Sequence, residues 1–301
     1  MTRRNIGKLT RLVTVDDLRV DMMHGLIHRA LAYKGGATYR FLEPKFVANL
    51  FYEHNTKSHY SFEMAQHRLG LKVLSFDPQS SSAYKGESMY DAGMMMSMLG
   101  IDVVVSASES ERYYEKWLEN ETFSSIVINA GDGDHEDPCH ALTDAMTIYE
   151  HFGTIDGLKV GFIGATHFSR VTKSTIKVLN QLGAQVFFSG PEQYQSRECH
   201  RLGRYLQIDE MIPNMDVIVI LRVQSEREDV AHLVDGYYEQ YGMTVERLAK
   251  LKENAILLHP GPVKRDVEIA NEGVECAQSK IFIQGQNSVY MNMAILEAVL
   301  A

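Results

Sequence analysis

Short apolar runs alternate with amphipathic stretches along most of this chain. In the first half, the runs have the length and bulky apolar content of buried strands, and the stretches between them carry apolar residues at helical spacing. The predicted strands span residues 46–51, 72–76, 102–106 and 125–128, and the predicted helices span 57–70, 88–99 and 110–119. Thr14 is the expected cap of an earlier helix that continues to Tyr33.

The second half repeats this alternation after one long helix. That helix is predicted from Pro138 to His151, with proline in its first turn and Gly153 just beyond its end. Strands are expected at 159–163, 185–188, 216–221, 255–258 and 281–283, and helices at 169–182, 244–253 and 287–301. Such alternation indicates parallel sheets flanked by helices, with ligands at the carboxyl ends of the strands. The prediction is an α/β chain with two doubly wound parallel-sheet domains joined by the long helix.

Composition narrows the class of protein. The chain has 301 residues, 45% of them hydrophobic, which is enough for a substantial core. Its net charge is −9 and it has no long basic run, so nucleic acid is not an expected partner. No apolar run reaches the roughly 20 residues of a membrane span, and the N-terminus lacks the apolar stretch of a signal peptide. The three scattered cysteines fit a reducing cytoplasm. We therefore expect a cytoplasmic protein.

The segment 51–63 places a polar helix start directly after an apolar strand. Asn55, Thr56 and Ser58 can cap this helix, and Lys57 adds a positive charge. Free backbone N–H groups and the helix dipole converge at such a start, so it is suited to binding an anion. An ordinary capped helix is the alternative explanation of the same residues.

Several further motifs follow this segment in order. They are Lys85-Gly-Glu-Ser88, Asn129-Ala-Gly-Asp-Gly133, Gly164-Ala-Thr-His-Phe-Ser-Arg170, Leu221-Arg-Val-Gln224 with Arg227, and His259-Pro-Gly-Pro262 with Arg265. Together with the segment 51–63, this ordered set resembles the catalytic chain of aspartate carbamoyltransferase, in the aspartate/ornithine carbamoyltransferase superfamily. The resemblance covers nearly the whole chain.

The resemblance has consequences for the architecture. It implies a donor-side domain for carbamoyl phosphate over residues 1–135, an amino-acid (aspartate-type) domain over 150–285, and a C-terminal helix at 286–301 that returns to the first domain. It also implies a homotrimer with shared sites, in which Lys85 reaches the cleft of a neighbouring chain. No cofactor is expected, and the implied role is a step of pyrimidine biosynthesis.

The amino-acid side of the implied site is intact in this chain. The resemblance assigns Arg170, Arg222 and Gln224 to a dicarboxylate amino acid such as aspartate. Two guanidinium groups suit two carboxylates because each can bind bidentately and keeps its charge at any working pH. The loop at Pro260 and Gly261 is expected to offer carbonyl acceptors to the amino group.

The donor side departs from the family pattern. Its usual Ser-Thr-Arg-Thr is Asn55-Thr56-Lys57-Ser58 here, with His59 also on the first turn of the helix. The strand-end arginine is Ala107, the carbonyl-polarising histidine is Asp137, the following glutamine is His140, and an arginine near the C-terminus is Asn292. Lysine keeps a positive charge, whereas alanine and aspartate make the pocket less favourable for a phosphate dianion.

The segment 132–140 is dense in polar side chains. Asp134, His135, Glu136, Cys139 and other members are all metal-ligand types, but their spacing matches no established ligand pattern, so no metal is predicted. The preferred interpretation is an acid–base or substrate-recognition pair formed by Asp137 and His140.

Three functions are compatible with these observations. The first is a carbamoyltransferase-like transferase that binds aspartate or a close dicarboxylate analogue and has a remodelled donor site, poorly suited to ordinary carbamoyl phosphate. The second is a genuine aspartate carbamoyltransferase. The third is a non-catalytic paralogue that binds a ligand. The intact acceptor arginines favour a transferase, and the altered donor residues favour the first function over the second.

Overall fold

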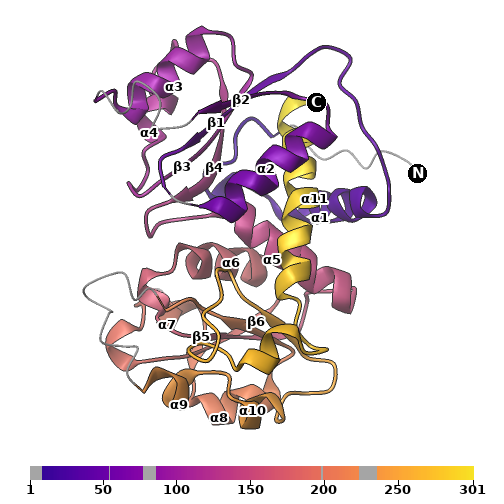
Figure 1. The fold of residues 1–301 in the computed structure, drawn as a ribbon, viewed down its shortest axis with the longest axis vertical. Coiled ribbons are helices and arrows are strands. Elements are labelled where there is room, and N and C mark those ends of the chain that lie inside the picture. Colours follow the sequence, from indigo (N-terminus) through magenta and orange to yellow (C-terminus); the bar gives the residue numbers. More distant parts are fainter. Residues whose placement is uncertain (1–8, 54, 77–85, 198, 224–235) are drawn as a thin grey trace. The chain divides into compact units, whose positions relative to one another are not determined.

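A computed structural model describes residues 9–53, 55–76, 86–197, 199–223 and 236–301. The chain divides into two compact units (Figure 1). Unit 1 comprises Met1–Met146 together with Gly285–Ala301, and unit 2 comprises Thr147–Gln284.

The sheet of unit 1 has four parallel strands in the order β2-β1-β3-β4. They are β1 (Phe46–Phe51), β2 (Lys72–Phe76), β3 (Val103–Ser108) and β4 (Ile126–Asp132). Strand β3 is buried along its whole length, which explains why it opens with three consecutive valines rather than with alternating apolar and polar residues. Because the chain adds β2 on one side of β1 and β3 on the other, the strand order reverses between β1 and β3. The carboxyl ends of these two strands are where such a sheet binds ligands.

The first predicted helix is replaced by two elements. Thr14 begins a short 3-10 turn at Val15–Asp17, Leu18 is extended, and the α-helix α1 spans Val20–Lys34. The Asp17 carboxylate accepts the backbone N–H groups of Val13 and Thr14, at 2.8 and 3.1 Å. This closed turn separates Thr14 from α1, so the prediction of one helix starting at Thr14 was wrong.

The other helices of unit 1 are α2 (Thr56–Arg68), α3 (Met89–Met98) and α4 (Glu115–Leu118), with the start of α5 (Pro138–Phe152). A helix predicted over 110–119 is shortened to α4. Arg112 has a φ of 53°, a left-handed conformation that no α-helix accommodates, and it therefore delays the helix start.

The C-terminal helix α11 (Ile281–Leu300) belongs to unit 1 from Gly285 onward. Residues 281–283 form its first turn, so the strand predicted there was wrong; a short apolar run cannot distinguish a strand from a buried helix end. Figure 1 shows α11 beside α1 and α2. Glu297 forms an ion pair with Arg29 of α1 at 2.5 Å, and Asn292 donates to Ser61 of α2 at 3.0 Å.

The sheet of unit 2 has five parallel strands in the order β7-β6-β5-β8-β9. They are β5 (Lys159–Ile163), β6 (Gln185–Ser189), β7 (Arg204–Tyr205), β8 (Val217–Ile220) and β9 (Ile256–Leu258). The helices are α6 (Arg170–Gln181), α7 (Cys199–Leu202), α8 (Ile208–Met211), α9 (Tyr237–Tyr241) and α10 (Val245–Leu248). Two parallel-sheet α/β domains with a C-terminal helix confirm the predicted fold class.

Candidate functional site

A small pocket opens in unit 1 where α2, α5 and α11 meet. Its lining combines the first turns of two helices with polar side chains of the third. The residues are Lys57, Ser58, Ser61, Phe62, Ala130, Asp137, Cys139, His140, Thr143, Ser288 and Asn292. The pocket therefore brings together Lys57, Ser58, Asp137 and His140, which the sequence had singled out on separate segments.

The start of α2 supplies the cationic side of this pocket. The Asn55 side chain accepts the Ser58 N–H at 3.2 Å and so caps the helix, while Thr56 is exposed at its first position. Burial lowers the pKa of Lys57, and the carboxylates of Asp144 and Asp137 oppose that shift. The pKa of Lys57 is thus governed first by burial and then by these two carboxylates.

His59 also lies on the first turn of α2, but it does not line the pocket. Its ring stacks on Phe51 and Tyr60, with centroids 4.9 and 5.4 Å apart. Its buried Nε2 has no hydrogen-bond partner among the described residues. Packing against two aromatic rings accounts for its position.

The start of α5 supplies the acidic side. Asp137 Oδ1 accepts the backbone N–H of His140 at 2.9 Å and caps the helix. His140 Nε2 lies 3.3 Å from Asp144 Oδ1, in the next turn, and Asp144 is fully buried. The side-chain pair that the structure gives His140 is therefore with Asp144. No motif pointed to Asp144, although its i, i+4 spacing from His140 was a usable signal.

Cys139, which also lines the pocket, donates to the Asn129 carbonyl with an Sγ–O distance of 3.3 Å. Burial raises the pKa of its thiol. Because a nucleophilic cysteine must be a thiolate, this one serves as a packing and hydrogen-bonding residue.

Two positions where the resemblance expects arginine are filled differently. Ala107, at the end of β3, is fully buried and its carbonyl accepts the Tyr52 N–H at 2.9 Å. Asn292 is in the pocket lining and is hydrogen-bonded to Ser61, which joins α11 to α2. Neither position contributes a positive charge here.

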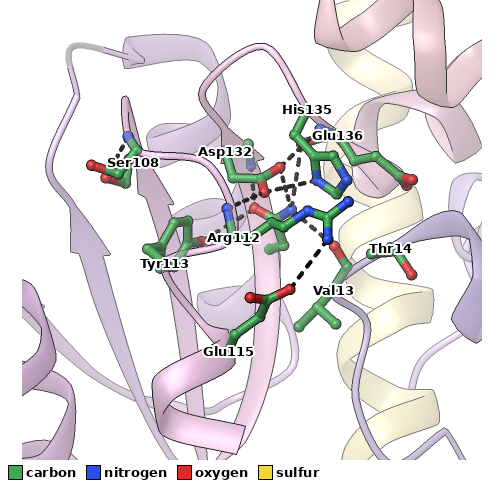
Figure 2. Close-up of polar contacts among 12 residues, drawn as sticks. Val13, Thr14, Ser108, Arg112, Tyr113, Glu115, Asp132, His135 and Glu136 are labelled. Carbon is green, nitrogen blue, oxygen red and sulfur yellow. Dashed lines mark hydrogen bonds and ion pairs between the residues drawn. The ribbon is translucent and has the colours of Figure 1, made fainter.

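A buried polar network fixes the loop that leads into α5 (Figure 2). Asp132 is fully buried; its Oδ1 accepts the Glu136 N–H at 2.8 Å, and its Oδ2 accepts the Arg112 N–H at 2.8 Å. His135 Nδ1 lies 3.0 Å from Asp132 Oδ2, and this hydrogen bond raises the pKa of His135 while burial opposes the shift. Glu136 accepts the Val15 N–H at 2.6 Å. These contacts give Asp132, His135 and Glu136 structural roles, and the next residue, Asp137, lines the pocket.

In unit 2 the strand order reverses between β5 and β8, and the predicted acceptor arginines follow those two strands. Gly164 directly follows β5 and has a φ of 132°, and a Cβ there would lie 2.9 Å from Leu221 Cβ. Arg170 is the first residue of α6, whose cap is Ser169. Arg222 follows Leu221, just beyond β8. Both arginines are partly exposed at the edge where a doubly wound sheet binds ligands.

The loop after β9 contains Pro260 and Gly261, both partly exposed. Its shape is held by His259, whose Nδ1 accepts the Gly261 N–H at 2.8 Å and whose Nε2 lies 2.8 Å from Glu268 Oε2. Glu268 was not predicted from the sequence, because no local pattern links it to His259.

Two predicted residues, Lys85 and Gln224, lie outside the described residues. In the part of the chain that the structure describes, no three His, Cys, Asp or Glu side chains gather as metal ligands. No helix within those same ranges is both long and apolar enough to cross a membrane.

Comparison with known proteins gives a consistent assignment of both halves. Residues 10–150 match the carbamoyl-P binding domain of the aspartate/ornithine carbamoyltransferases, and residues 156–299 match their Asp/Orn binding domain. The aspartate carbamoyltransferase catalytic subunit of Enterococcus faecalis is 44% identical over 295 residues, covering 97% of this chain and 96% of that protein. The corresponding subunit of Streptococcus pneumoniae is 44% identical over 299 residues, covering 99% and 97%.

A solved structure shows the same fold. Aspartate transcarbamoylase from Trypanosoma cruzi, crystallised with carbamoyl phosphate, has a TM-score of 0.89 and 26% sequence identity, covering 98% of this chain and 97% of that one. The match extends through both parallel-sheet domains, and the identity to the bacterial relatives extends over nearly the whole chain. The chain belongs to the aspartate/ornithine carbamoyltransferase family and is a transferase of that superfamily.

Proposed function

We propose that this chain is an aspartate carbamoyltransferase. In this reaction the amino nitrogen of L-aspartate forms a bond to the carbamoyl carbon, the bond from that carbon to the phosphate oxygen breaks, and the amine loses a proton. The products are N-carbamoyl-L-aspartate and phosphate. The observation that carries the proposal is 44% identity, over 97–99% of the chain, to catalytic subunits with that name.

The pocket of unit 1 is the proposed donor site. Lys57 and the first turn of α2, with Asn55, Thr56 and Ser58, would bind the phosphate by charge and by backbone N–H groups. Asp137 and His140 would orient the carbamoyl group and handle the proton, and Asp144 would hold the imidazole. Lys85 is proposed for the same site on the family resemblance.

The edge of unit 2 is the proposed aspartate site. Arg170 and Arg222 would bind the two carboxylates, with Gln224 beside them by resemblance. The backbone at Pro260 and Gly261 would accept hydrogen bonds from the amino group. Holding the acceptor in one orientation is one way in which an enzyme accelerates a reaction between two substrates.

A second candidate function is transfer to the same acceptor, aspartate, from a donor that carries less negative charge than carbamoyl phosphate. One observation favours it: Asp137 and Asp144 are buried and both act electrostatically on Lys57, so they compensate the positive charge of the pocket. Ala107 and Asn292 add no positive charge that would restore the balance. A phosphate dianion would therefore bind less strongly than in a pocket with arginines at these positions.

A turnover assay with carbamoyl phosphate and L-aspartate, combined with calorimetry, separates the candidates. For an aspartate carbamoyltransferase we expect turnover of roughly 1 per second or more. We also expect tight binding of N-(phosphonacetyl)-L-aspartate, which combines features of both substrates. Aspartate binding with no binding of carbamoyl phosphate would contradict the first candidate and support the second. Binding of a dicarboxylate without turnover of any acyl or phosphoryl donor would indicate that the protein is a non-catalytic paralogue.

An Asp137→Asn variant tests the charge balance directly. Asparagine keeps an Oδ1 that can cap α5, but it removes one negative charge near Lys57. If the carboxylate weakens donor binding, carbamoyl phosphate should bind about fivefold or more tightly, corresponding to roughly 1 kcal/mol. Glu63→Gln is the control, because it removes the same charge from α2 outside the pocket. Restoring arginine at position 107 is a poorer test, since Ala107 is fully buried.

A further inference from the structure

The backbone directly after Arg222 is held on both sides by side chains of one distant segment. The Val223 N–H donates to Glu268 Oε1 at 2.6 Å, and the Val223 carbonyl accepts from Lys264 Nζ, also at 2.6 Å. Val223 is buried and lies beyond the end of β8, so no strand neighbour performs this role. The peptide that carries Arg222 is therefore positioned by a carboxylate and an ammonium about 40 residues further along the chain.

Glu268 also holds the loop after β9. The residue is fully buried, and its Oε2 accepts the Lys264 N–H at 2.8 Å and contacts His259 Nε2 at 2.8 Å. Since His259 Nδ1 accepts the Gly261 N–H, Nε2 must carry the ring proton and donate it to Glu268. One carboxylate thus joins the segment of Arg222 to the loop of Pro260 and Gly261.

These contacts leave little freedom to either segment. The carboxylate has three hydrogen-bond donors, from Val223, Lys264 and His259, and hydrogen bonds to a charged group are stronger than neutral ones. Removing one acceptor oxygen would leave a buried donor unsatisfied, and the backbone would have to move to find another partner. Any such movement would shift Arg222 relative to residues 260–261.

We propose that Glu268 is a positioning residue for the acceptor amino acid, acting through Val223 and His259. Lys264 supports this role by donating a hydrogen bond to the Val223 carbonyl. The inference rests on the proposed function, because it assumes that Arg222 and the 260–261 loop bind the acceptor. Glu268 itself is not proposed to contact the substrate. It fixes the distance between the group that binds a carboxylate and the backbone that binds the amine.

The test uses the full chain and two independent measurements. Glu268→Gln keeps the shape but loses one acceptor oxygen, and Lys264→Met removes the contact to the Val223 carbonyl while leaving Glu268 in place. Hydrogen exchange is followed at the Val223 amide, and the KM for L-aspartate is compared with the KM for the donor. Tyr237→Phe is the matched control. The Tyr237 hydroxyl is buried, its pKa is raised by burial and by the charge of Glu268, and it has no hydrogen-bond partner among the described residues.

We expect both variants to speed exchange at Val223 and to raise the KM for aspartate about tenfold or more, with the donor KM changed less than twofold. Lys264→Arg should largely restore the aspartate KM. Unchanged exchange, or an equal rise in both KM values, would overturn the positioning role. Should Glu268→Gln fail to fold, Lys264→Met alone decides between these outcomes. The unmodified protein could bind no dicarboxylate while the variants still speed hydrogen exchange at Val223. In that case the proposed function is wrong, and Glu268 holds the backbone without positioning an acceptor.

Discussion

Lys57 is the residue whose environment bears most directly on donor binding. Burial lowers the pKa of its ammonium group, so it loses its proton at a lower pH than an ordinary lysine, whose pKa is near 10.4. Phosphate affinity should therefore fall as the pH is raised from 8 to 10. Lys57→Arg should remove this dependence, because a guanidinium stays charged, and Lys57→Met should weaken phosphate binding at pH 8 about tenfold or more.

Titration calorimetry with inorganic phosphate across this pH range measures the effect of Lys57. Lys72→Met is the control, since Lys72 is an exposed lysine of β2 outside the pocket. The same shift has a consequence for stability. Between the lowered pKa and the ordinary one, the unfolded chain binds more protons at this residue, so its contribution to stability rises with pH. A phosphate affinity that stays constant to pH 10 in the unmodified protein would contradict the role of Lys57.

The contribution of His135 to stability depends on pH in the opposite direction from that of Lys57. Its hydrogen bond with Asp132 raises the pKa of the imidazole, Glu136 adds to the shift, and burial and Arg112 oppose it. The stabilising contribution is fully present below the ordinary pKa of histidine, near 6.5, and is lost as the pH rises through the raised value. His135→Asn should therefore destabilise the protein by roughly 1 kcal/mol at pH 6 and by less at pH 9.

Urea unfolding of the His135→Asn variant at both pH values provides the comparison. His151→Asn, which removes an exposed imidazole bonded to Asn254, is the matched control. An equal loss of stability at pH 6 and pH 9 would mean that the charge of His135 is not what stabilises the Asp132 network.

At the scale of elements, the packing of α3 on α4 depends on a glycine inside a helix. A Cβ at Gly93 would lie 2.2 Å from the Trp117 ring, and the indole Nε1 donates to the Tyr90 carbonyl at 3.0 Å. Gly→Ala within a helix normally stabilises it, but here the added methyl group would displace a fully buried tryptophan. We expect Gly93→Ala to cost about 1–3 kcal/mol.

Gly285 in α11 provides the matched case. A Cβ there has no atom within 4 Å, so Gly285→Ala should stabilise the protein by up to about 1 kcal/mol. Chemical unfolding of the two variants side by side tests the prediction. A gain in stability for both would show that Trp117 can move without loss.

The elements that the sequence predicted well are those with one dominant local signal. Strands 46–51, 72–76 and 159–163 have the observed bounds, since each is a short run rich in bulky apolar residues, and α6 starts and ends within one residue of its prediction. The failures occur where a side chain from elsewhere decides the backbone, as with Asp17 beside Thr14, or where Arg112 adopts a left-handed conformation. Among the candidate site residues, motifs singled out Lys57 and Arg222, but no spacing rule links Val223 to Glu268.

At the scale of the whole molecule, we expect a homotrimer whose sites are shared between chains, as the family resemblance implies. An Arg170→Ala chain mixed with a Lys85→Ala chain should regain part of any activity, because some sites in the hybrids contain neither defect. Sedimentation analysis checks that the mixed chains have reassembled into trimers. Full inactivity in properly assembled hybrids would indicate that each site is built within one chain, and each variant alone is the control.

The discontinuous composition of unit 1 has a consequence for its biogenesis. Its strands and α1 are synthesised before unit 2, but Gly285–Ala301 is synthesised only after it. At roughly 5–20 residues per second, on the order of ten seconds separate the two parts. Unit 2, which is contiguous, can close during that interval. Unit 1 therefore begins to leave the ribosome before unit 2, but its fold can be completed only after unit 2 has been synthesised. Until then, the surfaces of α1 and α2 that α11 covers, around Arg29 and Ser61, remain available to a chaperone.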